Sequence, residues 1–126
     1  MKTAHDLVAL AKAKIQEVTV DQATPVLKGA DFLLDVREPD EYAAGHLPGA
    51  ISIPRGVLEF ILSSHAAFAA RDLNMVVYCK TSGRAALAAC AMLDMGYRQV
   101  ISISGGFDAW QAAGLPIEQP VHPAFE

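Results

Sequence analysis

The chain has 126 residues, 52% of them hydrophobic, and a formal net charge of -4. This length is that of one domain, which buries about two-thirds of its unfolded surface, and the mild acidity without any run of Lys or Arg argues against nucleic-acid binding. No apolar run approaches the roughly 18 residues of a membrane span, and neither a signal peptide nor a disulfide framework is evident. We therefore expect a cytoplasmic protein with no membrane or nucleic-acid partner.

The N-terminal segment, residues 1–17, predicts a helical extension of the main domain. Thr3 is a suitable N-cap for an amphipathic helix over residues 3–17. The apolar positions on its one face are Leu7, Val8, Ala11 and Ile15. We place the main domain at residues 18–117 and an extended surface tail at residues 118–126.

A short edge strand is expected at residues 18–20, followed by a helix. Thr19 and Gln22 have the spacing of a capping box, and the predicted helix runs to Gly29. Pro25 falls inside this helix, where it is expected to produce a kink.

From residue 32 onward, strands alternate with helices. The predicted strands cover residues 32–36, 50–53, 75–78 and 100–103. The helices begin at Pro39, Pro54, Gly83 and Gly105 and end near Gly45, Ser63, Gly96 and Gly114. In the second of these helices, the residues expected to face the core are Val57, Leu58, Ile61 and Leu62. This alternation predicts an α/β fold with a parallel sheet and helices on both faces.

Charged residues and a cysteine stand where three of these strands end. Ligands of parallel sheets bind at the carboxyl ends of the strands, so we expect a pocket there beside Cys79, with Arg55 or Arg37 on its rim. Asp35, Arg37 and Glu41 are interpreted as a structural ion-pair network.

Cys79 is the predicted reactive residue. A lone cysteine is commonly an inert core residue, but this one ends a strand and precedes a helix that begins at Gly83. A helix N-terminus offers free N–H groups and a positive dipole end, and Lys80 and Arg84 add positive charge, so the surroundings favour a nucleophilic thiolate. A basic loop in an acidic protein indicates a small anionic substrate.

The remaining polar residues fit structural roles better. His46 lies in a glycine-flanked loop and is expected to bond the backbone, whereas Cys90 falls inside the alanine-rich helix and should be packed. Phe107 and Trp110 are expected in the core. No metal-ligand spacing joins either cysteine to the other histidines, which are His5, His65 and His122. We therefore expect no metal.

Three motifs in order resemble those of the rhodanese family. They are Leu33 to Tyr42 with Gly45 to Ala50 and Ile53-Pro54, then Cys79 to Arg84, and then Gly105 to Trp110 with Gly114 to Pro116. The resemblance implies a five-stranded parallel sheet with helices on both faces and a cysteine, Cys79, that carries sulfur as a persulfide. Arg84 matches the arginine that closes the loop in many single-domain members, while Ser82 stands where such members often have glycine.

The expected activity is that of a thiosulfate sulfurtransferase with no cofactor. Cys79 would take a sulfane sulfur from an anionic donor such as thiosulfate and pass it to cyanide or a thiol. The backbone N–H groups of the loop would stabilise the persulfide, while Lys80 and Arg84, with Arg55 on the rim, would hold the donor. The loop residues expected to contact substrate are Lys80, Thr81, Ser82, Gly83 and Arg84.

Two other functions compete with this one. Phosphatases and arsenate reductases also close a cysteine loop with arginine, but they have five residues between the two, whereas four separate Cys79 from Arg84. The second is a carrier that receives persulfide from one protein and delivers it to another in a sulfur relay, and the same loop serves both. For Arg84, the structural alternative is an ion pair with a nearby carboxylate.

Overall fold

The protein is described by a computed structural model that covers residues 1–119, so most of the tail predicted for residues 118–126 lies outside the described part. Five parallel strands form one sheet in the order β1-β5-β4-β2-β3, which confirms the α/β class. The strands are β1 (Gln16–Val18), β2 (Phe32–Asp35), β3 (Ile51–Ser52), β4 (Asn74–Tyr78) and β5 (Gln99–Ile103).

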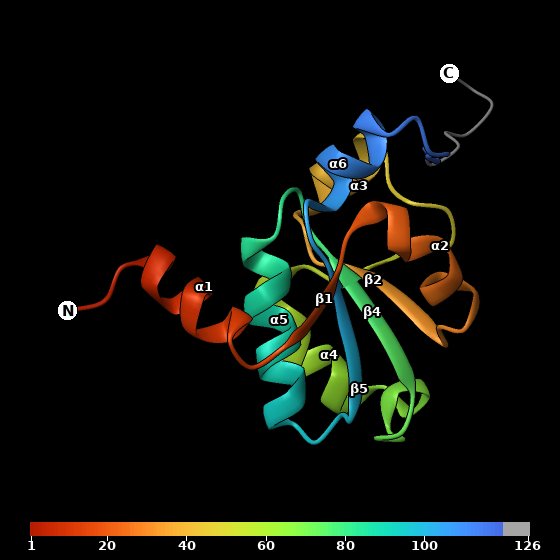
Figure 1. Cartoon of the computed structure of the whole chain (residues 1–126). Coiled ribbons are helices and arrows are strands. Elements are labelled where there is room, and N and C mark those ends of the chain that lie inside the picture. The colour runs from red at the N-terminus through yellow and green to blue at the C-terminus, as the bar shows by residue number, and fades with distance from the viewer. Residues whose placement is uncertain (120–126) are drawn as a thin grey trace.

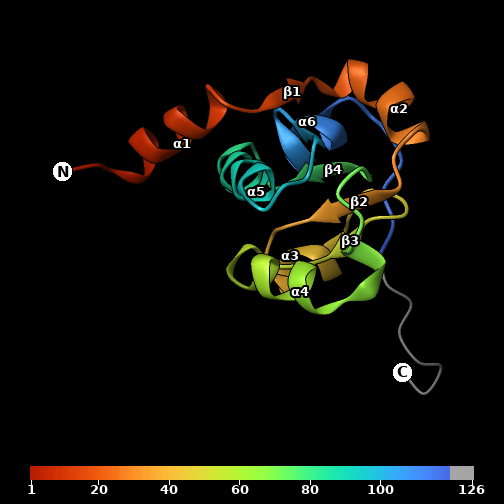
Figure 2. The ribbon, with the colours of Figure 1, turned by 90° about the horizontal axis from the view of Figure 1, so that it is seen from below.

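Helices cover both faces of the sheet (Figures 1 and 2). They are α1 (Ala4–Lys12), α2 (Val20–Lys28), α3 (Pro39–Ala44), α4 (Leu58–Ser64), α5 (Gly83–Asp94) and α6 (Gly106–Ala112), with 3-10 turns η1 (Arg55–Val57) and η2 (Ala66–Phe68). Helices α2 and α6 pack on one face and α4 and α5 on the other, while α1 projects beside α5. Within residues 1–119, no helix has the length and apolarity needed to cross a membrane.

The alternation of side chains along β4 divides the core and sets the direction in which Cys79 points. Met75, Val77 and Cys79 belong to the cluster under α4 and α5, whereas Val76 and Tyr78 point into the cluster under α2 and α6. Cys79 therefore faces the beginning of α5. All five residues are at most 2% exposed, so the strand that delivers the cysteine is fixed on both sides.

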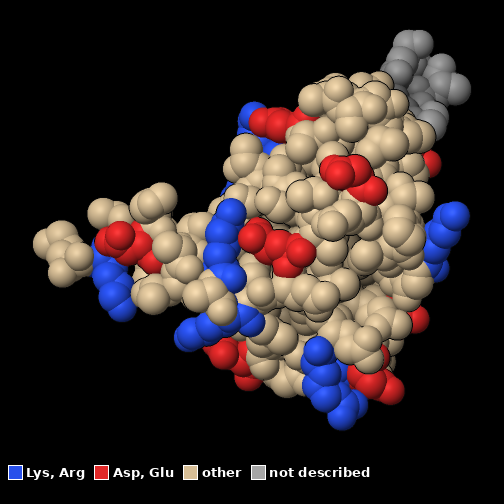
Figure 3. All heavy atoms as spheres, in the orientation of Figure 1, with Lys and Arg blue, Asp and Glu red and all other residues tan. Residues whose placement is uncertain are grey.

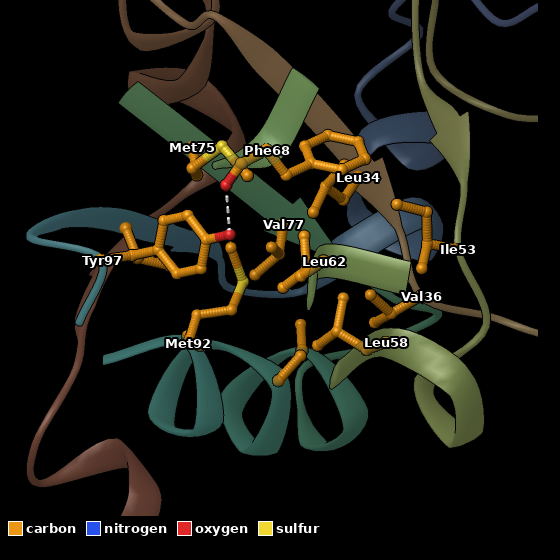
Figure 4. Packing of buried hydrophobic residues seen from close by; sticks show 14 of the residues in the cluster. Leu34, Val36, Ile53, Leu58, Leu62, Phe68, Met75, Val77, Met92 and Tyr97 are labelled. Carbon is orange, nitrogen blue, oxygen red and sulfur yellow. Dashed lines mark hydrogen bonds between the residues drawn. The ribbon is translucent and has the colours of Figure 1, made fainter. Parts of the chain in front are cut away.

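The cluster under α4 and α5 is the larger part of the core (Figure 4). Leu58 and Leu62 of α4 face Met92 of α5 across it, and the hydroxyl of Tyr97 donates a hydrogen bond to the carbonyl of Phe68. The prediction that Leu58 and Leu62 are core residues is confirmed.

Three details of the predicted elements are wrong. Helix α1 ends at Lys12 instead of residue 17, because Gln16–Val18 pairs with β5 as an edge strand, two residues earlier than predicted. The helix expected from Pro54 starts instead as the turn η1, which leaves Val57 42% exposed rather than in the core. The predicted start and capping box of α2 are confirmed, with Pro25 inside the helix.

Candidate active site

Cys79 lies between the end of β4 and the beginning of α5, as predicted. Its Sγ accepts a hydrogen bond from the backbone N–H of Ala85, at 3.3 Å, and the residue is 1% exposed. Ala85 is the third residue of α5, so the sulfur lies at the positive end of a 12-residue helix. In the part of the chain that the structure describes, the backbone N–H groups of residues 80–84 donate no hydrogen bond. They are donors available to an anion.

Helix α6 holds the loop from the other side. The N–H of Phe107 donates to the carbonyl of Cys79 at 2.8 Å, and the N–H of Asp108 donates to the carbonyl of Lys80 at 3.0 Å. Gly106, with φ +54, makes this approach possible: an ideal Cβ there would lie 2.6 Å from the Thr81 carbonyl oxygen. The sequence showed a helix start at this glycine pair but not its contact with the loop.

The two cations of the loop are both paired with carboxylates. Lys80 Nζ lies 2.6 Å from Asp108 Oδ2, with more than half of the lysine side chain exposed. Arg84 donates to both oxygens of Glu41, at 2.7 and 3.1 Å. The hydrogen bonds from Arg84 hold the pKa of Glu41 at about 2, and Glu41 in turn raises the pKa of Arg84. On the face in Figure 3, basic and acidic side chains likewise lie next to one another.

Arg55 follows β3 and is also paired. Its Nη1 donates to both oxygens of Glu59, at 2.9 and 3.1 Å, while Nε is buried with no partner among the described residues. The turn η1 that begins at Arg55 contacts α5.

The buried pair of Asp35 and Arg37 confirms the predicted ion-pair network. Arg37 donates to both carboxylate oxygens of Asp35 and to the carbonyl of Gly45, and the Tyr78 hydroxyl donates to Asp35 at 2.6 Å. Burial alone would lower the pKa of Arg37, but Asp35 outweighs it and the pKa is raised. Burial beside Asp35 also raises the pKa of Tyr78. Glu41, which we included in this network, bonds Arg84 instead.

A hollow of about 330 Å³ opens at the carboxyl ends of the strands. It is lined by Arg37, Glu41, Ala44, Gly45, Lys80, Phe107, Asp108 and Gln111. The hollow thus lies at the predicted edge of the sheet, with Arg37 on its rim. Neither Arg55 nor Cys79, which is 1% exposed, is among its lining residues, so a pocket directly beside Cys79 stays a prediction.

The residues set aside from the sequence have structural contacts. His46 bonds the carbonyl of Tyr42 through Nδ1 and stacks on its ring, Trp110 is buried, and Cys90 is half-buried in α5. No group of three His, Cys, Asp or Glu residues within residues 1–119 is arranged to hold a metal ion, and His122 lies outside that range.

One contact of the loop was not foreseen. Lys12, at the end of α1, donates a hydrogen bond from Nζ to Ser82 Oγ at 2.8 Å. The two residues are 70 positions apart, and no local pattern in the sequence signals such a pair.

Known proteins resemble this chain along most of its length. A sulfurtransferase of Allochromatium vinosum is 33% identical over 89 residues, 71% of this chain and 79% of that protein. The chloroplastic thiosulfate sulfurtransferase 16 of Arabidopsis thaliana is 35% identical over 108 residues, 79% of this chain and 89% of that protein. A Rhodopseudomonas palustris protein of unknown function, described as a possible tyrosine phosphatase, has a structure with TM-score 0.82 and 36% identity, covering 94% of this chain and 96% of that one.

The match to a family description covers the whole region that builds the site. It extends over residues 12–113, from the end of α1 past α6, and includes the cysteine loop, the Asp35–Arg37 pair and the glycines at the start of α6. The chain belongs to the rhodanese-like domain family.

Proposed function

We propose that this protein is a sulfurtransferase that carries sulfane sulfur as a persulfide on Cys79. The observation that carries the proposal is the position of Sγ, which accepts the N–H of Ala85 at the start of α5 and is followed by five backbone N–H groups without partners in the described structure. Such donors stabilise a compact anion in the manner of an oxyanion hole. The names of the Allochromatium and Arabidopsis relatives support the same chemistry.

The proposed reaction has two covalent steps. The Cys79 thiolate attacks the outer sulfur of thiosulfate, the sulfur–sulfur bond of the donor breaks, and sulfite leaves with the bonding electron pair. An acceptor thiolate, or cyanide in an assay, then attacks the outer sulfur of the persulfide and releases the Cys79 thiolate. Neither step needs a proton from a side chain when the acceptor is anionic, which agrees with the structural role of His46.

We assign different roles to the cations around the loop. Lys80 is the one best placed to meet the sulfur donor, because its side chain is 57% exposed and Asp108, with which it forms an ion pair, is a surface carboxylate. Arg55 is proposed as a second cation for the sulfur donor, although it is paired with Glu59 and does not line the hollow. Arg84 is held at both nitrogens by Glu41, so its proposed role is to fix the start of α5.

Mass spectrometry after exposure to thiosulfate tests the proposal. We expect the protein to gain the mass of one sulfur atom, which a peptide map places on Cys79 and which cyanide removes. Cys79→Ser should abolish the gain and leave the fold intact, whereas Cys90→Ser should retain most of the activity. A Cys90 variant as inactive as the Cys79 variant would instead mean a dithiol mechanism.

The same protein also tests two other functions. Persulfide transfer from a cysteine desulfurase that is faster than turnover with thiosulfate would identify a carrier in a sulfur relay. The description of the Rhodopseudomonas protein as a possible tyrosine phosphatase calls for an assay with p-nitrophenyl phosphate. We expect no hydrolysis, because four residues between Cys79 and Arg84 make a smaller ring than the five of phosphatase loops.

A further inference from the structure

The hydroxyl of Ser82 forms a hydrogen bond that is unusual for an N-cap residue. Ser82 is the N-cap residue of α5, and serine at this position normally accepts a hydrogen bond from the N–H of the second or third helical residue. Here the side chain makes no such bond, and its Oγ instead accepts from Lys12 Nζ at 2.8 Å. The third helical residue is Ala85, whose N–H donates its hydrogen bond to Cys79 Sγ.

A second N-cap in the same chain shows the ordinary arrangement. Thr3, at the start of α1, has the extended backbone of a capping residue, with φ -87 and ψ 169, and its hydroxyl accepts the N–H of Asp6 at 3.1 Å. Ser82 has φ -154 and ψ -15. To cap α5, Ser82 would have to turn about ψ toward the conformation of Thr3, and this rotation would reorient the peptide between Ser82 and Gly83 inside the cysteine loop.

Helix α1 is well placed to prevent this rotation. It packs along α5, as Figures 1 and 2 show, and Val8 Cγ2 lies 3.6 Å from where a Cβ on Gly83 would be. Lys12 is half-buried at the end of α1 and also lies 3.7 Å from Glu17 of β1. The lysine is thus fixed between the edge strand and the loop, with its ammonium group on the serine hydroxyl.

We infer that Lys12 is a positioning residue for the reactive cysteine: by holding the Ser82 side chain toward α1, it keeps the hydroxyl from turning to cap α5 and leaves the N–H of Ala85 to the Cys79 sulfur. The N-terminal helix is then part of the active site rather than an appendage. This inference rests on the proposed function of Cys79 but concerns the reactivity of its thiolate, which is measured without any sulfur donor.

A double-mutant experiment distinguishes this role from a merely structural one. The rate of Cys79 alkylation by iodoacetamide, a neutral reagent, is measured in the Cys90→Ser background for Lys12→Met, with and without Ser82→Ala. While Ser82 is present, Lys12→Met should slow alkylation about tenfold, the effect of one hydrogen bond to a charged sulfur. In the Ser82→Ala background, where no hydroxyl competes, the same substitution should change the rate by less than about twofold.

The controls separate charge from position. Lys14→Met, which removes an exposed lysine two residues further on, should leave the rate unchanged. Lys12→Arg keeps a donor and should restore most of the rate lost in Lys12→Met. Equal slowing by Lys12→Met in both backgrounds, or no slowing in either, would overturn the inference. If the wild-type protein fails to form a persulfide with thiosulfate, the proposed function is refuted, while the alkylation rates still decide the role of Lys12.

Discussion

Replacing Gly106 by alanine perturbs the contact between α6 and the cysteine loop at one point. Gly106 has φ +54, in the left-handed region that alanine enters only at a cost. An ideal Cβ would lie 2.6 Å from the carbonyl oxygen of Thr81 and closer still to that of Cys79, whereas ordinary contact begins at 3.4 Å. To reach ordinary contact, the Thr81 carbonyl must therefore move by about 0.8 Å.

The cost of this movement follows from the contacts that it breaks. The hydrogen bonds from Phe107 and Asp108 to the loop carbonyls are 2.8 and 3.0 Å long, and each contributes about 0.5–1.5 kcal/mol. The left-handed backbone adds about 1–2 kcal/mol for a residue with a Cβ. The free energy of unfolding should fall by about 2–5 kcal/mol in total, which lowers the melting temperature by roughly 8–20 °C in a domain of this size.

Gly49→Ala is the matched control. Gly49 also has a positive φ, +80, but an added Cβ would meet nothing within 4 Å, so this variant should lose only the backbone contribution of about 1–2 kcal/mol. The assays are thermal unfolding and iodoacetamide alkylation of Cys79 at a temperature where both variants are folded. Alkylation should slow about ten- to a hundredfold for Gly106→Ala alone. Equal stability of the two variants together with a wild-type alkylation rate for Gly106→Ala would refute the argument that α6 holds the loop.

Three further predictions concern the ion pairs of the site. Arg84→Gln should lower the free energy of unfolding by about 0.5–1 kcal/mol, since the pair with Glu41 is partly exposed. It should also slow thiosulfate turnover and alkylation of Cys79 by the same factor. A loss confined to thiosulfate turnover would instead assign Arg84 to binding of the sulfur donor. Because the pKa of Glu41 is lowered from 4.5 to about 2, the unfolded chain takes up this proton first, and stability from the pair is lost as pH falls from about 4.5 to about 2. Denaturant unfolding at pH 6 and pH 3 should show a loss of about 1 kcal/mol that Glu41→Gln removes. Asp108→Asn should free Lys80 and raise kcat/KM for thiosulfate about two- to fivefold at low ionic strength, and no change would argue against Lys80 as the donor-binding cation.

The order of the elements was predictable because its signals are local. The N-cap at Thr3, the capping box at Thr19, the apolar run of β2 and the glycine that ends α5 each involve residues a few positions apart. The end of α1 was not predictable in this way. Ile15 fits the helical periodicity, and only pairing with β5, more than 80 residues away, decides that Gln16–Val18 is a strand.

The same distinction separates what the sequence showed of the site from what it did not. Cys79 and the backbone of its loop were predictable because a strand, a cysteine and a helix start follow one another directly. The partners of the loop side chains were not, because they come from distant segments. Asp108 lies 28 positions from Lys80, Glu41 lies 43 from Arg84, and Lys12 lies 70 from Ser82.

The ion pairs of the cations near Cys79 affect how strongly these cations can attract an anionic sulfur donor. Lys80, Arg84 and Arg55 each have a carboxylate partner in the described structure, and a paired cation presents little net charge to an approaching anion. The unpaired donors of the loop are its backbone N–H groups, which carry no net charge and bind any compact anion that fits. The proposed persulfide would therefore depend on the backbone of the loop rather than on the donor that supplied the sulfur.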